Sequence, residues 1–211
     1  MTKKVTICIP TYNRDYYLGR CIRSILNQNF PKESYEIIVV NDGSTDKTDL
    51  VLNSFSDEIK VIKNKKKIGL SKSLNKAIIK SSGKYFLRLD SDDYVNENYI
   101  NFLFNTLDYN RNTFDGVKCD YYLVDDKENI IKRCDADKKP IACGIIFKVK
   151  DLFEIGMYNE KIKIYEEIDL IKRLNKKKRF KIFRIPIPLY RYRMHRSNMT
   201  NKKWKIKNLA N

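Results

Sequence analysis

The first 93 residues alternate short apolar runs with segments in which apolar residues recur at helical spacing. The runs Val5–Ile9, Tyr35–Val40 and Tyr85–Leu89 are apolar almost throughout, which is typical of strands covered on both faces of a parallel sheet. Ile59–Ile62 is a fourth, shorter run. Such alternation predicts right-handed βαβ units and an α/β fold with a mainly parallel sheet. The helical spacing is carried by Leu18, Cys21, Ile22, Ile25 and Leu26, and again by Leu70, Leu74, Ala77 and Ile78.

After Asp93 the pattern predicts a more mixed arrangement. Pro186 and Pro188 separate its last two strands, because proline is poorly tolerated inside a central strand. No repeat or linker divides the chain, so we expect one domain with halves at 1–95 and 96–197, followed by a basic tail at 198–211. The elements predicted here are a helix at 100–107, a hairpin of strands at 116–124 and 130–133, a helix at 166–176, and strands at 180–185 and 189–192.

Length, composition and cysteines limit the class of protein. At 211 residues, with 42% hydrophobic and 12% aromatic residues, the chain can bury one substantial core. Its five cysteines are scattered and form no C-x-x-C pair, which suits a reducing compartment better than a disulfide framework or a zinc site. The N-terminus has no cleavage-site pattern, and no apolar run approaches the ~20 residues of a membrane-spanning helix. We therefore expect a cytoplasmic protein.

The net charge of +17 comes from the C-terminal part of the chain. Residues 170–211 include 15 Lys and Arg and no Asp or Glu, whereas the other 169 residues carry 28 basic and 26 acidic residues. A concentrated basic surface favours polyanions such as phosphorylated lipids, an anionic membrane face or nucleic acid; a solvated, soluble surface is the alternative. Trp204 among the lysines of Lys202–Lys207 suits a peripheral contact with the inner face of a membrane.

Polar clusters follow three of the predicted strands. They are Pro10–Arg14, Asn41–Asp46 and Asp90–Asp93. Each alone could be a turn or a helix N-cap. Because the strands are parallel, all three clusters should lie at one edge of the sheet, where ligands of such sheets bind. The sequence therefore predicts a functional site there.

These clusters also resemble a known family. In order and spacing, Ile7–Arg14, Ile37–Asp46 and Leu87–Asp93 look like the nucleotide-sugar half of family 2 glycosyltransferases, and the resemblance extends from Val5 to Ser197. It implies a GT-A fold, with a Rossmann-like, mainly parallel sheet flanked by helices and a smaller mixed acceptor-side subdomain. It also implies that residues 1–95 bind a nucleotide-sugar donor and that residues 96–197 face the acceptor.

The resemblance implies roles for the first two clusters. Asp42 corresponds to the residue that accepts the N3–H of a uracil-type base, which favours a UDP-sugar, since a base without that donor would leave a buried carboxylate unpaired. The loop that packs along the base and ribose corresponds to Pro10, Thr11, Tyr12, Asn13 and Arg14.

The third cluster resembles the family's Asp-x-Asp motif. By this likeness Asp90 touches the ribose or a bridging water, and Asp92 coordinates the metal. Two carboxylates around one point repel each other unless a cation shares it, and oxygen ligands with a diphosphate suit Mn²⁺ or Mg²⁺. Asp93 is either a third ligand or a helix N-cap ahead of Glu97.

Two segments of the second half resemble acceptor-side motifs. Tyr165–Leu170 is similar to a Glu-Asp-x-Asp-Leu helix, which implies that Glu167 is the general base, with Glu where the family has Asp. An acidic helix start is the alternative. Glu166 and Asp169 lie three residues apart and would orient the helix rather than react. Gly144 corresponds to a small-residue loop beside the donor sugar, or is a simple turn.

The C-terminal motif resembles the family's Tyr-Arg-x-His segment. It makes His195 a metal or diphosphate contact. Arg193 lies among arginines with no acidic neighbours in sequence, and guanidinium groups grip phosphate, so we expect a diphosphate contact.

The implied reaction is a metal-dependent, inverting transfer of a sugar to an acceptor hydroxyl in surface polysaccharide or glycolipid synthesis. The acceptor would be a carbohydrate or a lipid-linked molecule. A nucleotidyltransferase is one alternative, but it would need a Gly-rich phosphate loop where Pro10–Arg14 stands. A basic module that binds nucleic acid or anionic lipid is another. Nucleic acid is not expected, because no base-stacking pattern of aromatics surrounds Trp204.

Overall fold

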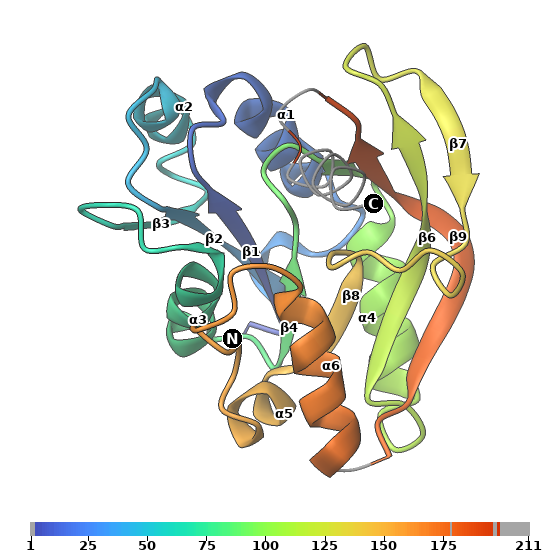
Figure 1. Cartoon of the computed structure of the whole chain (residues 1–211). Coiled ribbons are helices and arrows are strands. Elements are labelled where there is room, and N and C mark those ends of the chain that lie inside the picture. The colour runs from blue at the N-terminus through green and yellow to red at the C-terminus, as the bar shows by residue number, and fades with distance from the viewer. Residues whose placement is uncertain (1–2, 178, 196–197, 199–211) are drawn as a thin grey trace, which may run out of the picture.

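Parallel strands form the first half of a nine-stranded sheet in the computed structural model, which describes residues 3–177, 179–195 and 198 (Figure 1). Their order is β3 (Lys60–Lys63), β2 (Tyr35–Asn41), β1 (Val5–Thr11) and β4 (Tyr85–Arg88), and all neighbours pair in parallel. β1, β2 and β4 are buried along almost their whole length, as their apolar runs predict. The predicted parallel sheet is confirmed for this half.

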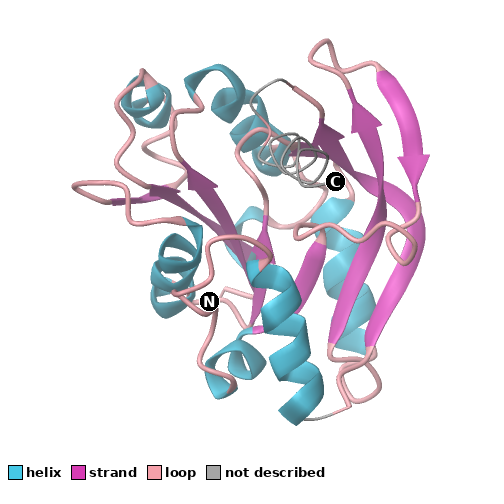
Figure 2. Cartoon of the chain, viewed as in Figure 1, coloured by secondary structure: helices cyan, strands magenta, loops and turns pink. Residues whose placement is uncertain are grey.

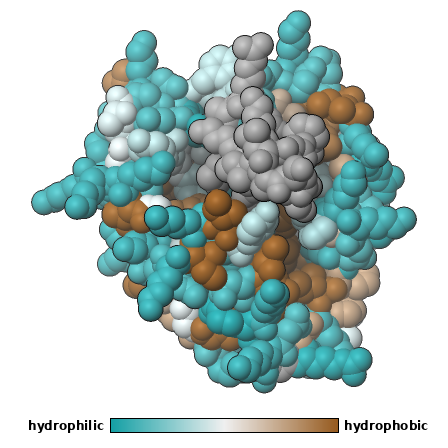
Figure 3. Space-filling view, in the orientation of Figure 1, coloured by the Kyte–Doolittle hydropathy of each residue, from teal (hydrophilic) through white to brown (hydrophobic). Residues whose placement is uncertain are grey.

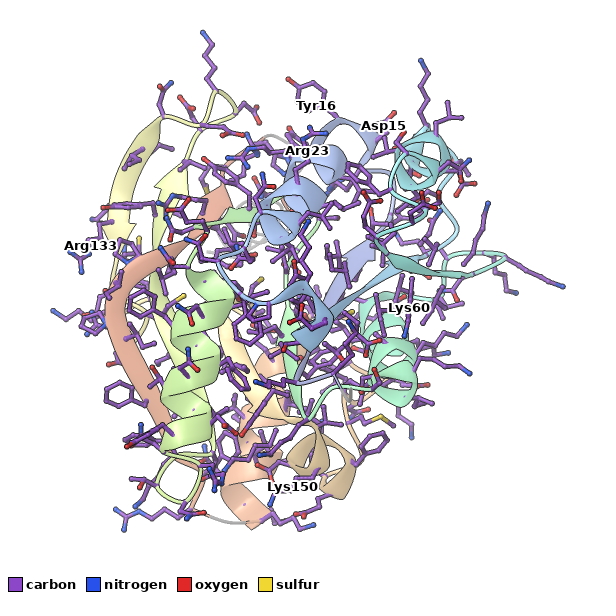
Figure 4. The ribbon with its side chains drawn as sticks, turned by 180° about the vertical axis from the view of Figure 1, so that it is seen from behind. Asp15, Tyr16, Arg23, Lys60, Arg133 and Lys150 are labelled. Carbon is purple, nitrogen blue, oxygen red and sulfur yellow. The ribbon has the colours of Figure 1, made fainter. Side chains whose placement is uncertain are left out.

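Helices cover both faces of the sheet. Ile7 and Ile9 of β1 belong to the core that includes α1 (Asp15–Leu26) and α4 (Tyr99–Tyr109). Cys8 lies in the opposite core, with α3 (Leu70–Lys80) and α6 (Glu166–Lys177), because successive side chains of a strand point to opposite faces. Figure 1 shows α3 and α6 on the near face, and Figure 4, seen from behind, shows α1 and α4.

β8 (Ile145–Lys148) joins the two halves of the sheet. It pairs antiparallel with β4 on one side and with β6 (Gly116–Val124) on the other. β6 also pairs antiparallel with β7 (Ile130–Cys134), which confirms the predicted hairpin, and parallel with β9 (Ile182–Arg193). β5 (Tyr94–Val95) lies beside β9. The second half is therefore a mixed extension of the same sheet (Figure 2).

The predicted break between two C-terminal strands is wrong. Residues 182–193 form one strand, β9, which contains Pro186 and Pro188. β5 pairs only with Tyr190 and Arg191, so within the described residues the proline segment has β6 as its only neighbour in the sheet. The pairing with β6 shifts register around Asp120, next to the prolines. An irregular, one-sided pairing tolerates the missing N–H groups.

The remaining elements are short: η1 (Lys32–Ser34), α2 (Thr48–Asn53) and α5 (Val149–Glu154). Like β5 and β8, they span too few residues to show a periodicity, and the sequence did not predict them. All five cysteines are buried and unpaired. In the part of the chain that the structure describes, no helix is long and apolar enough to cross a membrane. The predicted basic tail lies outside the described residues, except for Asn198.

Candidate active site

The carboxyl ends of β1 and β2 meet through hydrogen bonds between the first two polar clusters. The backbone N–H of Asn13 donates to the Ser44 hydroxyl at 3.0 Å, and the N–H of Thr45 donates to Asn13 Oδ1 at 2.9 Å. Asn13 has a φ of 52°, in the left-handed region that Asn tolerates better than most residues. The two loops therefore form one surface at this edge of the sheet, as the sequence predicts.

Asp42 organises the loop that follows β3. Its buried carboxylate accepts hydrogen bonds from Asn64 Nδ2 at 2.9 Å and from the backbone N–H groups of Ile68 and Gly69, both at 2.8 Å. Lys76 Nζ donates to Asn64 Oδ1 at 2.6 Å and so fixes the amide. Sequence reasoning missed Asn64, although it directly follows a fourth parallel strand at the same edge.

The loop after β2 also packs closely on the loop after β3. Gly43 has a φ of 73°, and a Cβ there would lie 2.6 Å from the backbone of Lys66. Only glycine meets both demands without strain. Next to this contact, the Lys67 ammonium lies 3.7 Å from the centroid of the Tyr12 ring. The residues predicted for the base therefore border a lysine-rich loop.

The structure brings Asp92, Arg14 and His195 together. Arg14 Nε donates to Asp92 Oδ2 at 3.2 Å, and His195 Nε2 lies 3.0 Å from the same oxygen. Burial raises the pKa of Asp92, but the hydrogen bond to His195 and the charge of Arg14 outweigh it, so the pKa is lowered. The backbone N–H of His195 donates to Asn198 Oδ1, which fixes the buried histidine.

Asp90 is held by a residue that sequence reasoning missed. Arg88 donates from Nε to Asp90 Oδ1 at 2.7 Å and from Nη2 to Oδ2 at 3.1 Å. Its Nη1 donates to Glu166 Oε1 at 2.9 Å, at the start of α6. The Cys143 thiol donates to Asp90 Oδ2 at 3.0 Å. An arginine inside an otherwise apolar, fully buried strand is the signal that could have identified it.

Asp93 anchors β9 rather than capping a helix. Its carboxylate accepts from the Tyr190 hydroxyl at 2.6 Å and from the backbone N–H of Arg193 at 2.8 Å. The N-cap interpretation is wrong, because α4 starts only at Tyr99. Burial and the charges of Asp92 and Asp90 raise the pKa of Asp93 well above its ordinary value. Asp93 therefore ties the residues after β4 to the end of β9.

The chemistry of these side chains fits a hard divalent cation. Within the described residues, ligand atoms of Asp90, Asp93 and Cys143 all lie within 4.8 Å of one another. Burial raises the pKa of the Cys143 thiol well above its ordinary value, and a soft sulfur ligand suits a hard cation less well than a carboxylate does. The carboxylates of the Asp-x-Asp motif remain, with the His195 imidazole beside Asp92, and carboxylate oxygens suit Mn²⁺ and Mg²⁺.

The expectation that Arg193 lacks an acidic partner is wrong. The buried guanidinium donates to Glu128 Oε1 at 2.9 Å and to the backbone oxygens of Asp92 and Asp126 at 3.0 and 3.1 Å. Glu128 lies in the turn between β6 and β7, far from Arg193 in sequence. Glu128 also pairs with Arg20 of α1 at 3.0 Å, so the tip of the β6–β7 hairpin contacts both α1 and the end of β9.

The residues predicted on the acceptor side lie at the start of α6 and before β8. Glu166 is the first residue of α6 and is buried against Arg88, while Asp169 pairs with Arg173 at 2.7 Å. Glu167, between them, is half-buried. Gly144, with a φ of 76°, forms the turn that leads into β8.

Solved structures are similar over nearly the whole chain. TarS of S. aureus (residues 1–349, in complex with UDP-GlcNAc) aligns with a TM-score of 0.79 over 94% of this chain and 60% of that chain, at 20% identity. The mannosyltransferase PcManGT from Pyrobaculum calidifontis, in complex with GDP-Man and Mn²⁺, aligns with a TM-score of 0.75 over 99% of this chain and 61% of that chain, at 16% identity. These likenesses show the fold and confirm the expected GT-A architecture.

Sequence relatives point the same way. The minor teichoic acid biosynthesis protein GgaB of Bacillus subtilis (strain 168) is 26% identical over 94% of this chain and 25% of its own length. The chain spans between 14% and 66% of the length of the first curated relatives it matches. The sequence model described as "Glycosyl transferase family 2" matches residues 6–198. The chain therefore belongs to glycosyltransferase family 2.

Proposed function

We propose that this chain transfers a sugar from a UDP-sugar to an acceptor hydroxyl, with a divalent cation and with inversion at the anomeric carbon. One observation carries the proposal: hydrogen bonds link the carboxyl ends of the parallel strands β1 and β4 to the C-terminal segment and to α6. Arg14, Asp92 and His195 form one such link, and Glu166, Arg88 and Asp90 form the other. Groups suited to the donor and to the acceptor thus share one edge of the sheet.

The donor would bind where the loops after β1, β2 and β3 meet. Pro10, Thr11, Tyr12, Asn13 and Arg14 would lie along the base and ribose, and Asp90 would face the ribose. The Asp42 carboxylate accepts three hydrogen bonds and keeps lone pairs for the N3–H of uracil. TarS binds UDP-GlcNAc and PcManGT binds GDP-Man on the same fold, so base preference has to be measured on this chain.

Asp92 and His195 would hold Mn²⁺ or Mg²⁺. A divalent cation bound there supplies positive charge against the developing charge of the departing diphosphate. The Arg14 guanidinium, 3.2 Å from Asp92, adds positive charge on the same side.

On the acceptor side, Glu167 would take the proton of the attacking hydroxyl. A single base opposite the leaving group gives inversion, so an α-linked donor yields a β-linked product. Glu166 and Asp169, held by Arg88 and Arg173, would keep the first turns of α6 in place. Gly144 would border the donor sugar.

The acceptor would be a surface polysaccharide or a lipid-linked precursor. Figure 3 shows apolar side chains gathered over the segment that leads into α6, where Ile164 and Ile168 are 49% and 45% exposed. Apolar surface next to the proposed base suits a lipid-linked molecule. GgaB, whose name places it in teichoic acid biosynthesis, supports a polymer of the cell surface. A contact of the basic tail with the inner face of the membrane would bring the two together.

The test is a donor screen that measures released nucleoside diphosphate in Mn²⁺. UDP-glucose, UDP-galactose and their N-acetyl forms are compared with GDP-mannose. We expect slow release of UDP from at least one UDP-sugar without acceptor, and faster release with extracted lipid-linked acceptors. Release from GDP-mannose alone would contradict the base preference assigned to Asp42, and no release from any donor would contradict the proposed function.

A further inference from the structure

Arg88 is a buried cation between two carboxylates from different halves of the chain. It lies on β4, and only 5% of the residue is exposed. Asp90 follows the same strand, whereas Glu166 begins α6 and lies 78 residues after Arg88 in the chain. A buried charge is expensive unless it is paired and fully hydrogen-bonded, and here two acidic groups meet that need.

The geometry of the guanidinium fixes both partners. Its donors form a rigid, planar fork. Nε and Nη2 contact the two oxygens of Asp90, at 2.7 and 3.1 Å, and so set the plane of that carboxylate. Nη1 contacts Glu166 at 2.9 Å and so sets the first residue of α6 relative to Asp90.

Glu166 directly precedes the proposed base, Glu167. Tyr165, just before α6, has a φ of 65°, so the chain turns sharply there. A displacement of Glu166 would therefore pass to Glu167 through the first turn of the helix. Misplacement of a reacting group by about 1 Å can cost about 10²-fold in rate.

We propose that Arg88 is a positioning residue that couples the donor side of the site to its acceptor side. The Nε and Nη2 donors of the guanidinium hold Asp90 for the nucleotide. Its Nη1 donor holds the start of α6, so that Glu167 faces the acceptor hydroxyl. This inference rests on the proposed transferase function. It differs from a purely structural ion pair, which would affect stability alone.

The two halves of the role are separable by substitution. Glu166→Gln removes the charge that Arg88 holds at the start of α6, so turnover should fall by roughly tenfold. It leaves the contact between Arg88 and Asp90, so UDP affinity should stay within about twofold of wild type. Arg88→Lys replaces the fork by a single ammonium that cannot hold both carboxylates, so turnover should fall by roughly 10²-fold and UDP affinity should weaken as well. The double variant should be no slower than Arg88→Lys alone, because both changes break one link.

Arg184→Lys is the matched control. Arg184 pairs with the buried Asp120 through two bonds of 2.7 Å, on β9 and β6, and the proposed site does not use either residue. This variant should lower the melting temperature but leave UDP affinity and turnover at wild-type values. A shared loss of activity would mean that any broken arginine pair disturbs the site, which would overturn the coupling role.

The experiment combines calorimetry of UDP binding in Mn²⁺ with UDP release from the UDP-sugar that wild type turns over, and with thermal melting. Wild-type or additive rates in the Arg88 and Glu166 variants would overturn the proposal while leaving the transferase function intact. No binding and no turnover by wild type would instead remove the proposed function and this inference with it. Where Arg88→Lys fails to fold, Glu166→Gln alone decides: reduced turnover with wild-type UDP affinity supports the coupling, and unchanged turnover refutes it.

Discussion

The imidazole Nε2 of His195 lies 3.0 Å from the carboxylate of Asp92, although 103 residues separate them in the chain. Asp92 follows β4 in the middle of the sheet, and His195 follows β9. Tyr17 of α1 stacks on the imidazole, with ring centroids 4.8 Å apart. The C-terminal segment is thus folded back onto the Asp-x-Asp motif, where the proposed cation would lie.

Replacement of His195 should weaken the binding of nucleotide in the presence of metal. With His195→Ala we expect UDP affinity in Mn²⁺ to fall by at least about tenfold, because a ligand and its hydrogen bond to Asp92 are lost together. Calorimetry measures the effect. Asp108→Asn, which loses an ion pair with Lys84 near the amino end of β4, is the control and should bind UDP normally. Equal affinity in His195→Ala and wild type would exclude His195 from the site.

Glu167→Gln should reduce turnover and spare nucleotide binding. The amide keeps the shape of the side chain but cannot take a proton, so we expect a loss of roughly 10²–10⁴-fold. Glu167→Asp, which restores the family's residue, should retain far more activity. Turnover is measured as UDP release with acceptor. If Glu167→Gln keeps most activity while Asp169→Asn abolishes it, the base has been assigned to the wrong residue of α6.

Gly43→Ala should damage the nucleotide site. A Cβ at Gly43 would combine a φ of 73° with an approach of 2.6 Å to the backbone of Lys66. We expect UDP affinity to fall and the free energy of unfolding to drop by about 1–3 kcal/mol. Gly156→Ala is the control, because its φ is 76° but nothing lies within 4 Å of the added Cβ. It should lose stability and keep UDP affinity; equal UDP affinity in both variants would contradict this role of the loop.

The stability of the fold should decline in acid because of Glu36. Burial alone raises the pKa of this glutamate, but hydrogen bonds from Lys60, Thr6 and Ser82 outweigh it and lower the pKa to about 2, from an ordinary value of 4.5. Figure 4 labels Lys60 on the outer strand β3. Because the folded pKa is the lower one, the stabilisation is fully present above pH 4.5 and is lost as the pH falls towards 2.

Urea unfolding of wild type and Glu36→Gln measures this contribution. The wild type should be more stable at pH 6, by up to about 3 kcal/mol, and the difference should shrink towards zero near pH 2. A difference that does not change with pH would show that Glu36 stabilises the fold by packing and not by its charge.

The parallel half of the sheet and its polar clusters were predictable because their signals are local. Val5–Ile9 and Tyr35–Val40 are continuous apolar runs, and the direction of parallel strands places the residues after them at one edge. The family resemblance then identified Asp42 and Asp92 by order and spacing. The GT-A fold class is confirmed on these grounds, and the roles of the individual site residues stay predictions.

Contacts between distant segments were not predictable. Arg88 with Glu166 and Glu128 with Arg193 depend on how β4, α6 and the hairpin tip pack in space, and a single sequence does not encode such pairs in any local pattern. Arg193 was expected to lack an acidic partner, and this expectation is wrong because its partner, Glu128, is distant in the sequence. The two strands predicted at 180–185 and 189–192 are one strand, β9, and its continuity was not predictable because its pairing, not its composition, allows the prolines.

The most direct test of the account is calorimetry of UDP binding under three conditions: wild type with Mn²⁺, wild type with EDTA, and Asp92→Asn with Mn²⁺. We predict clear binding in the first condition, and substantially weaker and mutually equal binding in the other two. UDP affinity that is the same in all three would contradict a metal-dependent nucleotide-sugar site at the Asp-x-Asp motif.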